Sequence, residues 1–109
     1  MERRNLYERF SGYEWPQQVG NLASTLARVS LLSTKLDYDK TLKDLLREAT
    51  LLIEWCAPGG SPDLQKDLSF MQRELLVWRN ISLESETRKL LSLRSRIMSD
   101  QLLEASGLL

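Results

Sequence analysis

Hydrophobic side chains return every three or four residues along most of this chain, a spacing that is typical of amphipathic α-helices. The pattern predicts four long helices, at residues 14–36, 38–57, 62–79 and 82–106. Residues 1–13 form a short amphipathic N-terminal arm, and residues 57–62 form the clearest break because they contain two prolines and two glycines. Short connections make consecutive helices antiparallel. The chain is therefore predicted to be all-α, a small four-helix bundle made of two antiparallel helical hairpins, in a single domain that spans residues 1–109.

The predicted helix at residues 14–36 has nonpolar side chains around most of its circumference. One stripe consists of large apolar residues, and the stripe beside it consists of small residues that include Gly20, Ala23 and Ala27. Residues this small let the backbone of a neighbouring helix come close. A helix of this kind is an inner helix of a bundle or one side of a dimer seam. Gly20, Ala23 and Ala27 are therefore candidate interface residues.

The ends of the later helices carry residues that suit helix termini. Ser61 is predicted to cap the third helix, with Pro62 at its first position. Ser82 is predicted to cap the fourth helix, and Gly107 follows that helix at the position where glycine is favoured.

Several apolar side chains fall outside the face that each hairpin is expected to bury. These candidate contact residues are Leu51, Trp55, Leu102, Leu103, Leu108 and Leu109. The last helix is longer than the third, so its final turns overhang and need cover. That cover is either a second copy of the chain or the N-terminal arm, which offers Leu6, Phe10 and Tyr13.

Polar side chains also interrupt the apolar faces of the third and fourth helices. They are Asp67, Glu74, Arg94 and Gln101. Counting outward from residue 81 places Asp67 level with Arg94, and Glu74 lies further along the same helix face. A buried guanidinium needs a carboxylate or a ligand anion, because an unpaired buried charge is costly. Arg94 therefore has three interpretations: a structural ion pair, a side chain that reaches solvent at the bundle edge, or a site for an external anion.

The composition argues against several classes of function. Fifteen basic and fifteen acidic residues give a net charge of zero, so no whole-chain field attracts nucleic acid or an anionic membrane. The chain has no histidine, the commonest general base near neutral pH and the commonest metal ligand, and only one cysteine, Cys56. We therefore expect no enzyme activity, no cofactor and no metal site. A cytoplasmic location is expected because the N-terminus lacks the apolar run of a signal peptide.

The sequence favours a non-catalytic protein–protein interaction or regulatory module that forms a homodimer. The reason is that apolar and small-residue surface exceeds what four antiparallel helices need. One alternative is a helical regulator that binds a small molecule or anion through Arg94 and Gln101. Another is a small all-α enzyme without histidine, in which arginine and glutamine hold an anionic substrate.

Overall fold

The computed structural model describes residues 3–107, which fold into helices joined by short turns, with no strand in that range. The helices are α1 (Arg3–Ser11), α2 (Trp15–Ser33), α3 (Asp39–Cys56), α4 (Pro62–Arg79) and α5 (Ser85–Ser106). Single 3₁₀ turns at Leu36–Tyr38 and Ala57–Gly59 follow α2 and α3. The predicted all-α helical bundle is confirmed.

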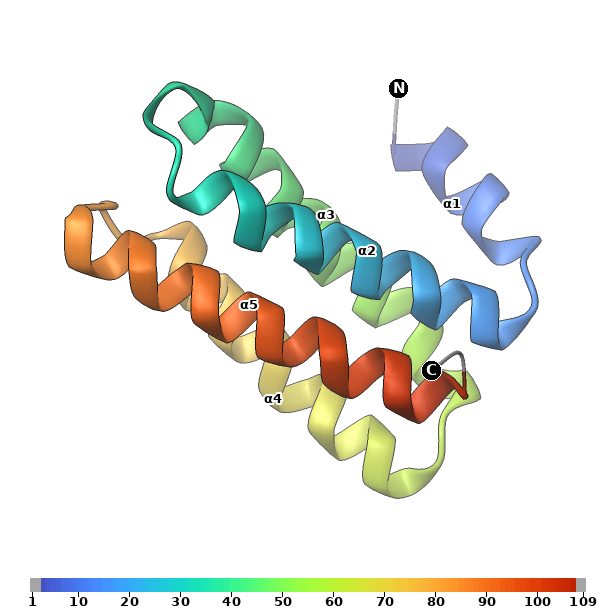
Figure 1. The fold of residues 1–109 in the computed structure, drawn as a ribbon. Helices are drawn as coiled ribbons and strands as arrows, with labels where there is room; N and C mark the ends of the chain where they lie inside the picture. The colour runs from blue at the N-terminus through green and yellow to red at the C-terminus, as the bar shows by residue number, and fades with distance from the viewer. Residues whose placement is uncertain (1–2, 108–109) are drawn as a thin grey trace.

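Helix α2 is central to the bundle because both α3 and α5 pack along it (Figure 1). Helix α4 packs against α3 but makes few contacts with α5, although the two are consecutive in the chain. The first hairpin, α2 with α3, is therefore closely packed. The second hairpin, α4 with α5, is open, and α5 joins the bundle mainly through α2.

The core contains large apolar side chains from all four long helices, together with Phe10 of α1. Fully buried members include Leu22, Leu26, Leu42, Leu46, Leu52, Ile53, Leu68, Leu75, Leu91, Met98 and Leu102. Helical spacing in residues 62–79 predicts one apolar stripe of Leu64, Leu68, Met71, Leu75 and Trp78. All of these except Leu64, which is half-buried, are buried residues of α4.

Small side chains hold α5 against α2. The Ser99 hydroxyl donates to the Ala23 carbonyl at 2.8 Å. The Ser30 hydroxyl donates to the Ser92 carbonyl at 2.7 Å, and the Ser92 hydroxyl donates to the Ser30 carbonyl at 2.9 Å. A serine can be buried at such a contact because its hydroxyl finds a backbone acceptor. The predicted close approach along the small-residue stripe of α2 is therefore present, and it occurs within the chain.

The apolar face predicted for the last helix is partly wrong. Helical spacing places Leu90, Leu93 and Ile97 on the broad apolar arc of this helix and so predicts them in the core, but their side chains are exposed. Ser95 and Ser99 are buried instead, because the helix turns its small residues toward α2. That orientation leaves the larger apolar side chains on the outside.

The start of α5 also differs from the prediction. Ser82 was expected to cap this helix, but the cap is Glu84, which forms a reciprocal capping box with Thr87. The Glu84 N–H donates to the Thr87 hydroxyl at 2.7 Å. The connection from α4 is therefore longer than expected. The other two predicted caps are confirmed: the Ser61 hydroxyl accepts from the Leu64 N–H, and Gly107 adopts φ 79°.

The N-terminal arm forms helix α1, which docks on the side of the bundle away from α5 (Figure 1). Phe10 is buried, and the Tyr7 and Phe10 rings contact the Trp55 ring with centroids 5.1 Å and 6.1 Å away. Gln18 Nε2 donates to the Phe10 carbonyl at 3.1 Å. The arm therefore covers the Trp55 side of α3. It does not cover the final turns of α5, where Leu102 is buried in the core and Leu103 lies near Gly20 of α2.

Candidate functional site

Arg94 forms an ion pair with Glu74 across the open side of the bundle, between α5 and α4. The contact is bidentate: Arg94 Nε donates to Glu74 Oε2 at 2.9 Å, and Nη2 donates to Oε1 at 2.8 Å. Trp78 Nε1 also donates to Glu74 Oε2, at 3.1 Å. The hydrogen bonds from Arg94, helped by the one from Trp78, hold the pKa of Glu74 below its ordinary value. Among the interpretations of Arg94, the internal ion pair is the one observed.

Of the two acidic residues that the sequence offered to Arg94, Glu74 is the observed partner and Asp67 is not. Asp67 is exposed and makes no ion pair with Arg94, and Gln101 is exposed as well. The prediction counted outward from residue 81, but α5 begins only at Ser85, so the longer connection brings Glu74 level with Arg94. The predicted polar site of Arg94, Gln101, Asp67 and Glu74 therefore reduces to a single neutralised pair.

Most candidate interface residues are used inside the chain. Ala23 and Leu102 are fully buried, Gly20 and Ala27 lie half-buried on α2, and Leu103 is half-buried near Gly20. Leu51 is half-buried on α3, and Trp55 is half-buried under the rings of α1. Leu108 and Leu109 lie outside the described residues. Surface that was expected to need a partner is therefore largely covered by the chain's own helices.

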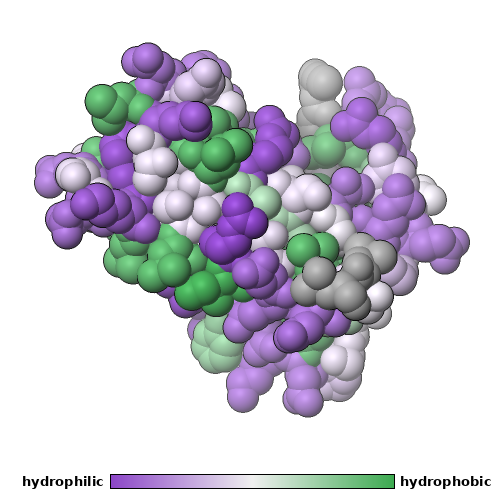
Figure 2. All heavy atoms as spheres, in the orientation of Figure 1, coloured by the Kyte–Doolittle hydropathy of each residue, from purple (hydrophilic) through white to green (hydrophobic). Residues whose placement is uncertain are grey.

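A different apolar surface is exposed on the outer side of α4 and α5. It consists of Phe70, Val77, Leu90, Leu93 and Ile97, whose exposed fractions lie between 37% and 57%. We call it the α4–α5 face. In Figure 2, hydrophobic surface gathers along the first half of α5 and continues toward α4. The sequence reasoning placed the α5 members of this face in the core. The serines at positions 92, 95 and 99 could have indicated the buried face of α5, because their spacing matches that of the small residues of α2.

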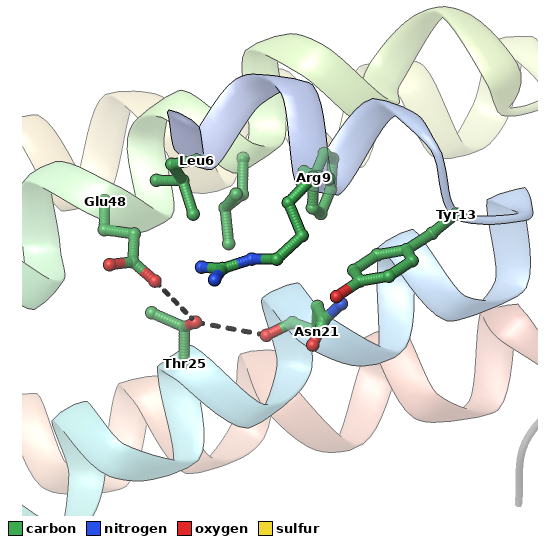
Figure 3. A pocket seen from close by; sticks show the side chains of 8 residues that line it. Leu6, Arg9, Tyr13, Asn21, Thr25 and Glu48 are labelled. Carbon is green, nitrogen blue, oxygen red and sulfur yellow. Dashed lines mark hydrogen bonds between the residues drawn. The ribbon is translucent and has the colours of Figure 1, made fainter. Parts of the chain in front are cut away.

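A small pocket lies beneath α1, and the sequence analysis did not predict it (Figure 3). Its volume is about 260 Å³. Its walls are built by α1 with the following turn, by α2 and by α3. The lining residues are Leu6, Arg9, Phe10, Tyr13, Asn21, Thr25, Glu48 and Leu52. The pocket therefore combines apolar walls with one cationic, one anionic and several neutral polar side chains.

Helical spacing places Lys43 and Arg88 on the polar sides of their helices, where they are expected to face water, but both bind helix ends. Lys43 Nζ donates to the carbonyls of Arg79 and Ile81 at 2.8 Å and 2.9 Å, where α4 ends. Arg88 Nη2 donates to Asp39 at 2.7 Å, and Nη1 donates to the Ser33 carbonyl at the end of α2. Cations are favoured at helix C-termini. The hydrogen bond from Arg88 also lowers the pKa of Asp39. We assign Lys43 and Arg88 a structural role, because each connects its own helix to the end of another helix.

Cys56 lies in the core at the end of α3, where it is 1% exposed. Burial raises the pKa of its thiol to about 11. The thiol therefore stays protonated near neutral pH and has little nucleophilic character.

No protein family, no curated protein and no solved structure was found to match this chain. Within residues 3–107, none of the helices combines the length and the apolar character that crossing a membrane requires.

Proposed function

We propose that this protein is a non-catalytic interaction module that forms a homodimer through the α4–α5 face. The observation that carries the proposal is the exposure of Phe70, Val77, Leu90, Leu93 and Ile97 on one side of two neighbouring helices. Single exposed apolar residues are common on protein surfaces, whereas a contiguous group of large ones marks an interaction surface.

The ion pair within this face supports the same function. Arg94 and Glu74 neutralise each other through two hydrogen bonds, so neither charge needs a partner from outside. Bidentate pairs of this kind have fixed geometry. The α4–α5 face can therefore be covered by another apolar surface without leaving an unpaired charge beneath it.

The charges beside the α4–α5 face favour a second copy as the partner. At about 100° per residue, Lys66 shares the outer side of α4 with Phe70 and Val77, and Glu104 shares the outer side of α5 with Ile97. Both side chains are exposed, and neither forms an ion pair within residues 3–107. Because Glu74 is level with Arg94 and the helices are antiparallel, Lys66 and Glu104 lie near the same end of the face. A symmetric pair that sets α4 of one protomer on α5 of the other therefore brings each lysine toward a glutamate.

Light scattering coupled to size-exclusion chromatography tests the proposal on the full chain. We expect a dimer for the wild type and a monomer for Leu93→Glu, because a buried carboxylate without a partner opposes association. Leu31→Glu is the matched control, since Leu31 is a similarly exposed leucine, at 59%, on α2. The control should remain dimeric.

Two results would count against the proposal. If the wild-type protein stays monomeric across the accessible concentration range, the homodimer is ruled out. A Leu93→Glu variant that dimerises as well as the wild type would move the interface away from the α4–α5 face. Circular dichroism on both variants shows whether the fold is retained.

A further inference from the structure

The pocket beneath α1 differs from an ordinary seam between a covering helix and its support. Leu6, Phe10 and Leu52 form apolar walls, as a packed contact requires, and Phe10 and Leu52 are each 2% exposed. Asn21, Thr25 and Glu48, however, line the surface that α1 covers. Polar side chains under a covering helix are favourable only if something satisfies their hydrogen bonds. Arg9 is exposed, and Asn21 and Glu48 are half-buried, so the pocket keeps open space beside polar groups that water or a ligand can reach.

Much of this hydrogen-bonding capacity is unused within the chain. Glu48 Oε2 accepts only a long bond from the Thr25 hydroxyl, at 3.4 Å, and that hydroxyl also lies 3.1 Å from the Asn21 carbonyl. Across residues 3–107, the guanidinium of Arg9 and the hydroxyl of Tyr13 have no hydrogen-bond partner. An arginine side chain carries five N–H donors. The groups are arranged around the pocket and not against one another.

The two charges of the pocket face a common space. Figure 3 shows the Arg9 side chain extending from α1 toward Thr25 and Glu48, which belong to α2 and α3. Arg9 and Glu48 nevertheless form no ion pair with each other. A cation and an anion held apart across a small cavity suit a ligand that carries both charges, with its carboxylate on the arginine and its ammonium on the glutamate.

The volume limits the size of such a ligand. Pockets for drug-sized molecules typically begin at about 300 Å³, so a pocket of about 260 Å³ suits a smaller molecule. Leu6 is half-buried and would contact a nonpolar side chain of that molecule, while Phe10 and Leu52, each 2% exposed, close the pocket behind it. We infer that the pocket beneath α1 binds a small zwitterion with an apolar body, of the class of the apolar α-amino acids, between Arg9 and Glu48.

Isothermal titration calorimetry on the full chain tests this inference with L-leucine, L-isoleucine, L-methionine and L-phenylalanine as probes. We expect at least one of them to bind with a dissociation constant in the millimolar range or lower. Two analogues that each lack one charge, 4-methylpentanoate and 3-methylbutylamine, serve as comparisons for L-leucine. Each should bind about tenfold more weakly than the amino acid, because one charge-assisted hydrogen bond is lost.

Variants then locate the site. Arg9→Gln and Glu48→Gln should each weaken binding by about tenfold or more. Arg4→Gln and Glu54→Gln are the matched controls, since both residues are exposed on the same two helices and do not line the pocket. The controls should bind like the wild type.

Hydrogen exchange provides a second readout. Four of the eight lining residues, Leu6, Arg9, Phe10 and Tyr13, come from α1 and the turn after it. A bound zwitterion should therefore slow amide exchange in α1 more than in α4. The inference is overturned if none of the four amino acids produces binding heat, or if the variants and their controls bind equally well.

Discussion

Helix α5 has two neighbours that it contacts in different ways. Toward α2 it presents Ser92, Ser95 and Ser99, and the two backbones come close enough for side-chain hydroxyls to reach carbonyls of the opposite helix. Toward α4 it makes few contacts, and Arg94 reaches across to Glu74. Small residues let α5 pack closely against α2, while the larger side chains between α5 and α4 keep those two helices further apart.

This difference explains where the unused apolar surface lies. Ridges of small side chains allow helices to pack closely, and the helix turns those residues toward its neighbour. Leu90, Leu93 and Ile97 then point outward because they occupy the other side of the same helix. The interaction surface that we propose is thus a consequence of the closely packed seam.

The largest effect is expected from adding volume to the α2–α5 seam. Ala23 is fully buried, so Ala23→Leu should lower the free energy of unfolding by about 1–3 kcal/mol. The matched control is Ser24→Leu, which adds a similar side chain at an exposed neighbour and should have little effect. Urea unfolding followed by circular dichroism measures both. Equal stability of Ala23→Leu and wild type would mean that the seam is not closely packed.

A smaller effect is expected from breaking the ion pair on the open side. The Arg94 and Glu74 side chains are 39% and 28% exposed, so Arg94→Met should lower the free energy of unfolding by only about 1 kcal/mol. The double variant Arg94→Met with Glu74→Met should recover part of that loss, because no carboxylate then lacks its partner. Stability of the double variant below that of Arg94→Met would contradict this account of the pair.

The same pair should contribute to the pH dependence of stability. The pKa of Glu74 in the folded protein lies below its ordinary value of 4.5, so the unfolded chain binds this proton more readily. The contribution is therefore fully present above about pH 4.5 and is lost as the pH falls through the folded-state pKa. Urea unfolding of wild type and Glu74→Gln between about pH 3 and about pH 6 gives the slope of the free energy of unfolding against pH for each protein. The wild type should lose more stability in acid, and parallel curves would be evidence against the shift.

The smallest effect is expected at the charges that flank the α4–α5 face. Exposed ion pairs contribute about 0.2–1 kcal/mol, so Lys66→Glu and Glu104→Lys should each weaken dimerisation only slightly. The double reversal should restore the wild-type affinity, since it exchanges the two charges between protomers. Sedimentation equilibrium of the three variants checks this result. A double variant that dimerises more weakly than both single variants would rule out the proposed pairing.

The helical hairpin of α2 and α3 was predictable because the spacing of large apolar residues indicates one buried face on each helix. Helical spacing places Leu42, Leu45 and Ile53 on the apolar face of its second helix, and all three are in the core. Counting outward from the short connection places Leu22 level with Leu52, and the hydrogen bond between Thr25 and Glu48 fits that antiparallel alignment. Here large apolar residues and a short connection both indicate the same arrangement.

The face of α5 was not predictable from hydrophobicity alone, because two patterns compete along that helix. Its large apolar residues define a broad arc, and its serines define a narrower stripe that fits the small residues of α2. A serine counts as polar in a sequence pattern, although a backbone acceptor allows it to be buried. Helical spacing also could not decide between Asp67 and Glu74 as the partner of Arg94, because the cap of α5 is Glu84 and not Ser82, which changes the alignment with α4.

The pocket beneath α1 had no signal in the sequence. Arg9, Asn21 and Glu48 are far apart in the chain, and each fits the polar side of an amphipathic helix. They meet only because α1 folds back over α2 and α3 through the contacts of Phe10 with Trp55. A tertiary contact of a short terminal helix is beyond what helical periodicity determines.

The most direct test of the central claim is a dilution series followed by methyl NMR of the wild-type protein. If the α4–α5 face joins two copies, the methyl resonances of Val77, Leu90, Leu93 and Ile97 shift with protein concentration. The methyls of Leu31 and Leu36, which are also exposed, should stay unchanged and serve as internal controls. Resonances that do not depend on concentration in a monomeric sample, or shifts that centre on Leu31 and Leu36, would contradict the proposed interface.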